Sequence, residues 1–97
     1  MQVGMHINAL KAIAEKRRDE FEKRRMTNEV IFQGWIVAGC DQILGRVAPD
    51  TLIPQSLWAW VTEKVESLGN TTWQAGRNEV IDEIVFALSA ALTTNAQ

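Results

Sequence analysis

The chain has 97 residues, 46% of them apolar and 23% charged, which predicts one globular domain over residues 1–97. A single cysteine, Cys40, excludes an internal disulfide framework and favours a reducing, cytoplasmic compartment, while a net charge of -2 argues against a general affinity for nucleic acid. We expect neither a membrane nor a secreted protein, since no apolar run reaches the roughly 20 residues that a bilayer requires and residues 1–10 do not resemble a signal peptide.

Four segments show helical periodicity, so we expect an all-α domain packed as a small four-helix bundle. The first helix is predicted over residues 5–25, and its apolar stripe ends near Ala14. Beyond that point Arg17 and Arg24, seven residues apart, lie above one another on the same face. We therefore expect this half of the helix to project past the bundle or to bury its arginines against acidic partners.

The second helix is predicted over residues 27–44 and is apolar nearly all round, which is typical of a central, buried helix. Gly34 and Gly39 each lower the intrinsic stability of this helix by about 1 kcal/mol, which indicates a close approach by a neighbouring segment. The third and fourth helices are predicted over residues 54–68 and 73–92.

Tryptophan is frequent, with four residues, and the apolar stripes predict where each one lies. Trp35, Trp58 and Trp73 fall on apolar stripes and are expected in the core, whereas Trp60 falls at the edge of its stripe.

Asp41 is the only charged residue between residues 30 and 44, and a buried carboxylate requires a partner. Arg17 and Arg77 both fall on apolar faces, so we expect one of them to pair with Asp41.

Groups with catalytic potential are scarce. His6 is the only histidine, and Cys40 lies in the most apolar helix, where burial raises the pKa of a thiol and makes it inert. The sequence contains no glycine-rich phosphate loop, nucleophile elbow or zinc-ligand spacing. We therefore expect a protein that is not an enzyme and that holds no cofactor.

Three carboxylates, Glu79, Asp82 and Glu83, share one face of the fourth helix. All-helical nucleotide pyrophosphohydrolases hold Mg²⁺ with such acidic pairs, but they need a second acidic motif on a facing helix. Asp19 and Glu20 are the nearest candidates and lack a third carboxylate at helical spacing. A solvated acidic face is therefore favoured over a metal site.

Phe86 lies in the middle of this acidic face, nearly opposite the apolar stripe of its helix. An aromatic side chain among carboxylates suits a partner that is basic and partly apolar. The alternative is that the first helix or a second subunit covers Phe86 as ordinary core. We predict a partner-binding site made of Phe86, Glu79, Asp82, Glu83 and Trp60.

Residues 16–25 hold six cations interleaved with carboxylates. Oppositely charged residues four apart are typical of a solvated helix, whereas a phosphate-binding helix would carry its cations without carboxylates between them. Nucleic-acid contact is therefore not favoured. The pairs expected to form are Arg18–Glu22, Asp19–Lys23 and Glu20–Arg24.

The segment Trp73–Ile84 follows the pattern W-x-x-G-x-N-x-x-I-D-x-I, which resembles a pattern of small phage and prophage accessory proteins. The resemblance covers about 12 of the 97 residues. It implies a phage context and assigns no role to any residue. Such proteins, anti-CRISPR proteins among them, often bind and inhibit or redirect a host or defence complex.

Two hypotheses follow for the function. The first is a protein-binding module, a phage-encoded inhibitor or modulator of a host or defence protein complex. The second is a homo-oligomeric structural or regulatory protein, such as a homodimer, in which the same aromatic residues form a self-interface.

Overall fold

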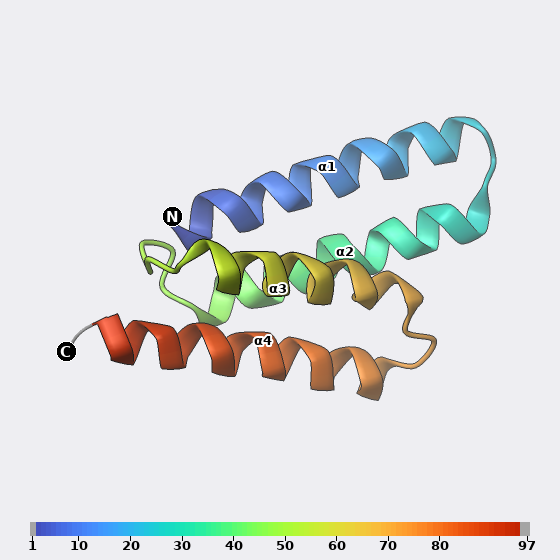
Figure 1. Ribbon diagram of the computed structural model, residues 1–97. Coiled ribbons are helices and arrows are strands. Elements are labelled where there is room, and N and C mark those ends of the chain that lie inside the picture. Colours follow the sequence, from blue (N-terminus) through green and yellow to red (C-terminus); the bar gives the residue numbers. More distant parts are fainter. Residues whose placement is uncertain (1, 96–97) are drawn as a thin grey trace.

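The computed structural model describes residues 2–95, with side chains through residue 91, and confirms the predicted all-α fold (Figure 1). The helix ends lie close to the predicted ones, although the second helix continues two residues beyond residue 44 and the fourth three beyond residue 92. The helices are α1 (Val3–Lys23), α2 (Thr27–Arg46), α3 (Gln55–Ser67), the short 3-10 helix η1 (Leu68–Asn70) and α4 (Gln74–Asn95).

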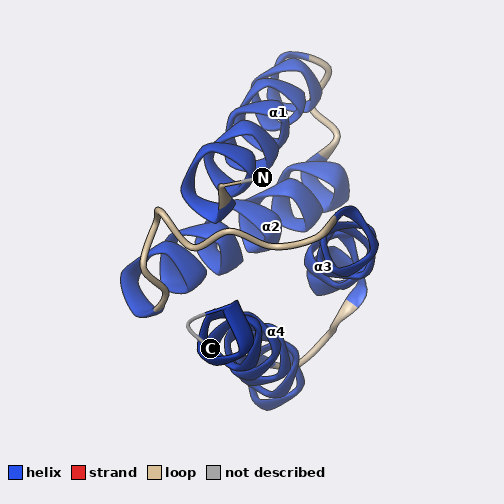
Figure 2. Cartoon of the chain, turned by 60° about the vertical axis from the view of Figure 1, so that its left-hand side comes forward, coloured by secondary structure: helices blue, strands red, loops and turns tan. Residues whose placement is uncertain are grey.

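Helix α2 is central, as its apolar sequence predicts. Helix α1 packs along one side of α2, and α3, η1 and α4 contact its other sides, so that α1 and α4 lie on opposite sides of α2 (Figure 2). Every helix contributes to the core, which removes apolar side chains from water at about 25 cal/mol per Å². The side chains with the least exposure are Ile7, Cys40, Ile43, Val61, Val65, Leu68, Ile84 and Leu88.

Glycines allow η1 to lie directly against α2. A Cβ atom on Gly39 would overlap the side chain of Leu68, and one on Gly69 would lie 2.6 Å from the ring of Phe32. At Gly34, in contrast, an added Cβ would meet nothing within 4 Å. The close approach predicted for two positions of α2 is therefore confirmed at Gly39 and wrong at Gly34.

The loop between α2 and α3 caps the start of α1. The amide of Val3 donates to the carbonyl of Thr51 at 2.9 Å, and the amide of Gly4 donates to that of Pro49 at 2.8 Å. These bonds satisfy two of the four amides that the first turn of a helix leaves unpaired. Gly4 is required here, because a Cβ atom at this position would lie 2.6 Å from Cβ of Pro49.

The turn from α1 to α2 is a Schellman motif. The amide of Met26 donates to the carbonyl of Phe21, and the amide of Arg25 donates to that of Glu22, both at 3.0 Å. Arg25 has a φ of 57°, a left-handed conformation that glycine usually supplies. This turn lies at the end of the α1–α2 hairpin, which extends beyond the ends of α3 and α4 (Figure 1).

Two of the three tryptophans expected in the core are exposed, Trp35 to 38% and Trp73 to 62%. The ring of Trp35 lies 3.5 Å from Cζ of Arg77, so a stacked guanidinium covers it where the sequence suggested apolar neighbours. Trp73 precedes the first residue of α4, and its indole lies beside Gly76 on the surface. Trp58 is half-buried and packs against the core, which agrees with the prediction.

The partner predicted for Asp41 is wrong. Asp41 is exposed, and its Oδ1 lies 2.6 Å from Nζ of Lys11, on α1. Arg77 is buried and donates to the carbonyl of Thr71 at 2.7 Å, and Arg17 is exposed. Helical periodicity places Asp41 on a face, but only the register between α1 and α2 determines which cation it meets.

The ion pairs predicted within residues 16–25 are not formed: among the residues that the structure describes, no oppositely charged atoms in this segment approach within 4.0 Å. Its cations extend into solvent instead, with Arg18 half-buried and the other five exposed. The absence of these ion pairs is consistent with the small net free energy that solvent-exposed pairs four residues apart contribute to stability.

Candidate functional site

An open groove of about 610 Å³ runs between α3 and α4. Phe86, on the outer face of α4, is its most exposed large apolar side chain at 77%. Trp60, from α3, is half-buried and packs against the core with part of its ring. The lining residues are Trp60, Glu79, Asp82, Glu83, Phe86 and Ala87.

The groove exists because the two helices meet through their inner faces only. Ile84 and Leu88 of α4 and Val61 and Val65 of α3 are fully buried. Phe86 lies two residues after Ile84, which turns its side chain about 200° away from the core. The spacing that fixes Ile84 inside thus places Phe86 outside.

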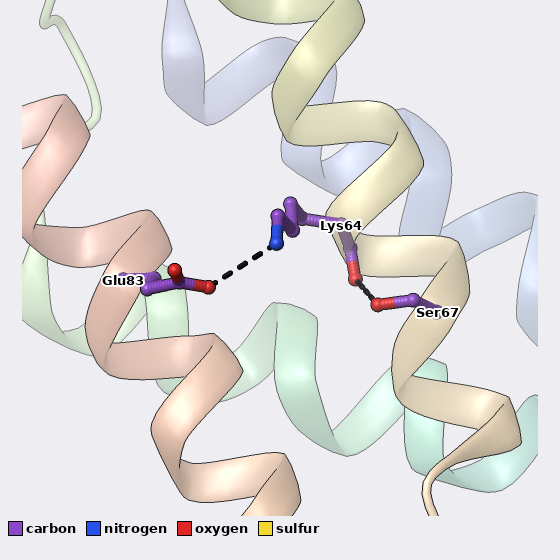
Figure 3. A network of polar contacts seen from close by, with 3 residues as sticks. All are labelled: Lys64, Ser67 and Glu83. Atoms are coloured by element: carbon purple, nitrogen blue, oxygen red, sulfur yellow. Dashed lines mark hydrogen bonds and ion pairs between the residues drawn. The ribbon is translucent and has the colours of Figure 1, made fainter.

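Two carboxylates of the groove already have intramolecular partners. Oδ1 of Asp82 lies 2.7 Å from Nη1 of Arg46, at the end of α2. Oε2 of Glu83 lies 3.3 Å from Nζ of Lys64, across the groove on α3 (Figure 3). Both pairs are solvent-exposed, so each contributes at most about 1 kcal/mol to stability.

Lys64 links the acidic and the aromatic parts of the groove. Its Nζ lies 5.6 Å from the ring centroid of Trp60 and is the same atom that pairs with Glu83. An ammonium group near an indole face is attracted by the ring quadrupole. The carbonyl of Lys64 accepts a 2.6 Å hydrogen bond from Oγ of Ser67, within the same helix (Figure 3).

Glu79 differs from the other two carboxylates. Among residues 2–91, no cation lies within 4.0 Å of it. Glu79 and Phe86 are seven residues apart, about two turns or 10 Å along α4. The groove thus offers an apolar anchor and, two turns away, a carboxylate that a ligand can pair with.

All five residues that the sequence predicted as a binding site line this one groove, and their role in binding remains a prediction. Sequence analysis missed the cations Arg46 and Lys64, which neutralise part of the acidic face. The four-residue spacing of Trp60 and Lys64 was a signal for their contact. Nothing in the sequence fixes Arg46 beside Asp82.

The groups considered for catalysis lie elsewhere in the fold. The His6 ring packs against Trp58, with 5.1 Å between centroids, which joins α1 to α3. Burial raises the pKa of the Cys40 thiol to about 12. In the part of the chain that the structure describes, no three histidine, cysteine, aspartate or glutamate side chains gather as a metal ion would require.

Within the same described residues, none of the helices combines the length and the apolar character needed to cross a membrane.

The residues that form the pattern of the segment Trp73–Ile84 have structural roles within this chain. Gly76 leaves room for the indole of Trp73, Ile81 and Ile84 enter the core, and Asp82 pairs with Arg46. No protein family model, no curated protein and no solved structure matches the chain.

Proposed function

We propose that the protein is a non-enzymatic binding module that takes a basic, partly apolar segment of another protein into the α3–α4 groove. The observation that carries this proposal is the 77% exposure of Phe86 beside Trp60, in a groove with three carboxylates. Central aromatic side chains often supply most of the free energy of an interface. A bound apolar side chain would cover Phe86, and a lysine or arginine beside it would pair with Glu79.

A partner of different sequence suits this groove better than a second copy does. A twofold self-contact would bring two acidic grooves against one another, and among residues 2–91 no cation lies within 4.0 Å of Glu79 to offset that repulsion. The segment Trp73–Ile84 resembles a pattern of phage accessory proteins, and such proteins, anti-CRISPR proteins among them, often bind a host or defence complex. A host or defence complex is therefore the first place to look for the basic partner segment.

A titration with a defined probe tests the proposal. The probe is a synthetic helical peptide with one leucine face and two lysines, and its matched control carries glutamates in place of the lysines. We expect the basic peptide alone to shift the NMR signals of Phe86, Glu79 and the Trp60 indole. Phe86→Ala should weaken binding by about 2 kcal/mol, roughly thirtyfold, and leave the melting temperature nearly unchanged.

Two control variants separate the groove from general surface effects. Glu79→Lys should slow association and reverse its salt dependence, whereas Glu20→Lys, an equal charge change on exposed α1, should alter both much less. Met5→Ala removes another exposed apolar side chain and should leave binding unchanged. Shifts confined to residues outside the groove, or equal binding of both peptides, would contradict the proposal.

A further inference from the structure

A small pocket between α2 and α4 contains a buried arginine. Its volume is about 40 Å³, and it shares no lining residue with the α3–α4 groove. Arg77, the fourth residue of α4, is only 8% exposed although its side chain is charged. A charge that loses its hydration on folding requires compensation from its neighbours. The residues that line the pocket around Arg77 include Trp35, Gln42, Gln74 and Asn78.

Contacts within the chain leave Arg77 without a counterion. Its Nη1 donates to the carbonyl of Thr71 at 2.7 Å, and its Cζ lies 3.5 Å from the ring centroid of Trp35. A guanidinium carries five N–H donors, so one carbonyl satisfies it only in part, and an indole ring attracts a cation but carries no net charge. Among residues 2–91, no carboxylate oxygen lies within 4.0 Å of Arg77. Because buried charges are normally paired, an anion is the partner that Arg77 lacks.

The surroundings of Arg77 also favour an anion. None of the described residues that line the pocket is acidic, and Gln42, Gln74 and Asn78 contribute carboxamides, which can donate hydrogen bonds. The pocket lies at the start of α4, where the first amides of a helix have no intrahelical acceptor and the helix dipole places partial positive charge. The first turn of α4 contains no acidic residue that would use this charge.

The size of the pocket favours a carboxylate over a phosphate. A volume of about 40 Å³ is little more than the roughly 30 Å³ that one water molecule occupies in the liquid. The three heavy atoms of a carboxylate lie in one plane, whereas a phosphate is tetrahedral and larger. The planar guanidinium matches the two oxygens of a carboxylate, with which it forms charge-assisted hydrogen bonds.

We propose that the pocket between α2 and α4 binds a carboxylate, with Arg77 as its principal partner. The carboxylate belongs to a small organic acid or to an aspartate or glutamate side chain of another protein, since both present the same group. Trp35 is 38% exposed and lines the same pocket, so its indole can contact the carbon atoms of the ligand. The site takes a charge opposite to that proposed for the groove, and it does not rest on the proposed function.

A titration with acetate tests the site. Acetamide, which has nearly the same shape and no charge, is the matched control, and sodium chloride keeps the ionic strength constant. We expect acetate to shift the NMR signals of the Arg77 guanidinium and the Trp35 indole with a Kd of roughly 1–50 mM, as suits a ligand of four heavy atoms. Acetamide should shift them much less. Equal shifts with both ligands, or tighter binding of phosphate than of acetate, would overturn the proposal.

A blocked peptide with one aspartate and no other charge distinguishes the two sources of the carboxylate. Binding at least as tight as that of acetate assigns the pocket to a protein side chain. Binding of acetate alone assigns it to a small acid. Arg77→Lys keeps the positive charge and removes the planar fork, so it should weaken acetate binding about tenfold or more. Circular dichroism checks that this variant folds, because Arg77 also bonds to Thr71.

A second variant supplies the anion from within the chain and keeps Arg77. Gln74→Glu places a carboxylate among the lining residues, and it should raise the melting temperature and weaken acetate binding at least about tenfold. Ala75→Glu is the matched control, because it adds the same charge to the same helical turn at an exposed position that does not line the pocket. Both variants gain from the helix dipole, so Gln74→Glu should exceed Ala75→Glu by about 2–5 °C.

Two results would overturn the proposal and assign Arg77 a structural role only. The first is the same melting temperature and the same acetate affinity for Gln74→Glu and Ala75→Glu. The second is an acetate affinity that Arg77→Lys leaves unchanged in a folded protein. Neither result affects the α3–α4 groove, because the groove is tested with a basic peptide and with variants of other residues.

Discussion

The contact between α1 and α2 is closed, by which we mean that the two helices pack side by side. The contact between α3 and α4 is closed towards the core and open towards solvent, where the groove lies. Ile7 and Ala14 of α1 pack on the buried side of α2, and the Lys11–Asp41 pair links the two helices at the surface. In the second contact, Ile84 faces the core while Phe86, two residues later, faces solvent. The comparison shows that α4 contributes to stability with one face and leaves another face exposed, the face for which we propose a role in recognition.

The largest expected effect separates the two faces of α4. Ile84→Ala should lower the free energy of unfolding by about 2–5 kcal/mol, because it removes buried methyl groups and leaves a cavity. Phe86→Ala should change it by less than about 0.5 kcal/mol. Urea denaturation of both variants measures the difference. Equal destabilisation would mean that Phe86 belongs to the core.

The second prediction compares solvent access in the two regions. Cys40 is fully buried in α2, and its thiol pKa rises from 9.0 to about 12 through burial. A thiol reagent at pH 8 should modify Phe86→Cys in the groove at least about a thousand times faster than Cys40. Denaturant should abolish the difference. Rapid labelling of native Cys40 would show that the interior opens easily.

The same thiol gives a pH dependence. Below pH 9.0 the thiol is protonated in both the folded and the unfolded chain and contributes no slope. Between pH 9.0 and about 12 only the unfolded chain releases the proton, so the free energy of unfolding falls as the pH rises. Because lysines and arginines also titrate in this range, the contribution of Cys40 is the difference from Cys40→Ala, which should lose stability less steeply.

The third prediction concerns the end of the closed contact, at the turn after α1. Arg25→Gly should stabilise the protein by about 1 kcal/mol, because glycine adopts the left-handed conformation of this turn without steric cost. Arg25→Ala serves as the control and should not stabilise, since it removes the charge and keeps Cβ. Thermal unfolding measures both. An equal gain from alanine would assign the effect to charge instead.

The smallest expected effects come from two of the surface ion pairs, Lys11–Asp41 and Lys64–Glu83. Lys11→Met in the closed contact and Lys64→Met in the open one should each change stability by less than about 1 kcal/mol. They should differ in recognition, because Lys64→Met frees Glu83 in the groove and Lys11→Met does not affect the groove. Stronger binding of the basic peptide by Lys64→Met alone is the expected result of the same titration.

The sequence was sufficient for the elements and for the groove, since both depend on helical spacing within one helix. Phe86, Glu79, Asp82 and Glu83 share a face of α4 whatever packs on its other side. Trp60 was included in the predicted site because it lies at the edge of the apolar stripe of α3. Such properties are local, so periodicity alone predicts them.

Several of the errors concern contacts between helices. Asp41 pairs with Lys11 rather than with an arginine, and Trp35 is covered by Arg77, because the register of neighbouring helices selects these partners. Trp73 was assigned to an apolar stripe, but it precedes the first turn of α4, where helical periodicity no longer applies. The sequence therefore predicts which side of a helix a residue occupies better than it predicts which residue of a neighbouring helix it contacts.

The loop that caps α1 has a consequence for local opening. The amides of Val3 and Gly4 depend on carbonyls from Pro49 and Thr51, almost fifty residues further along the chain. When that loop detaches, these two amides lose their acceptors even if the rest of α1 stays folded. Their hydrogen-exchange rates therefore report on the loop between α2 and α3 and follow its opening, while amides in the middle of α1 follow the unfolding of the helix itself.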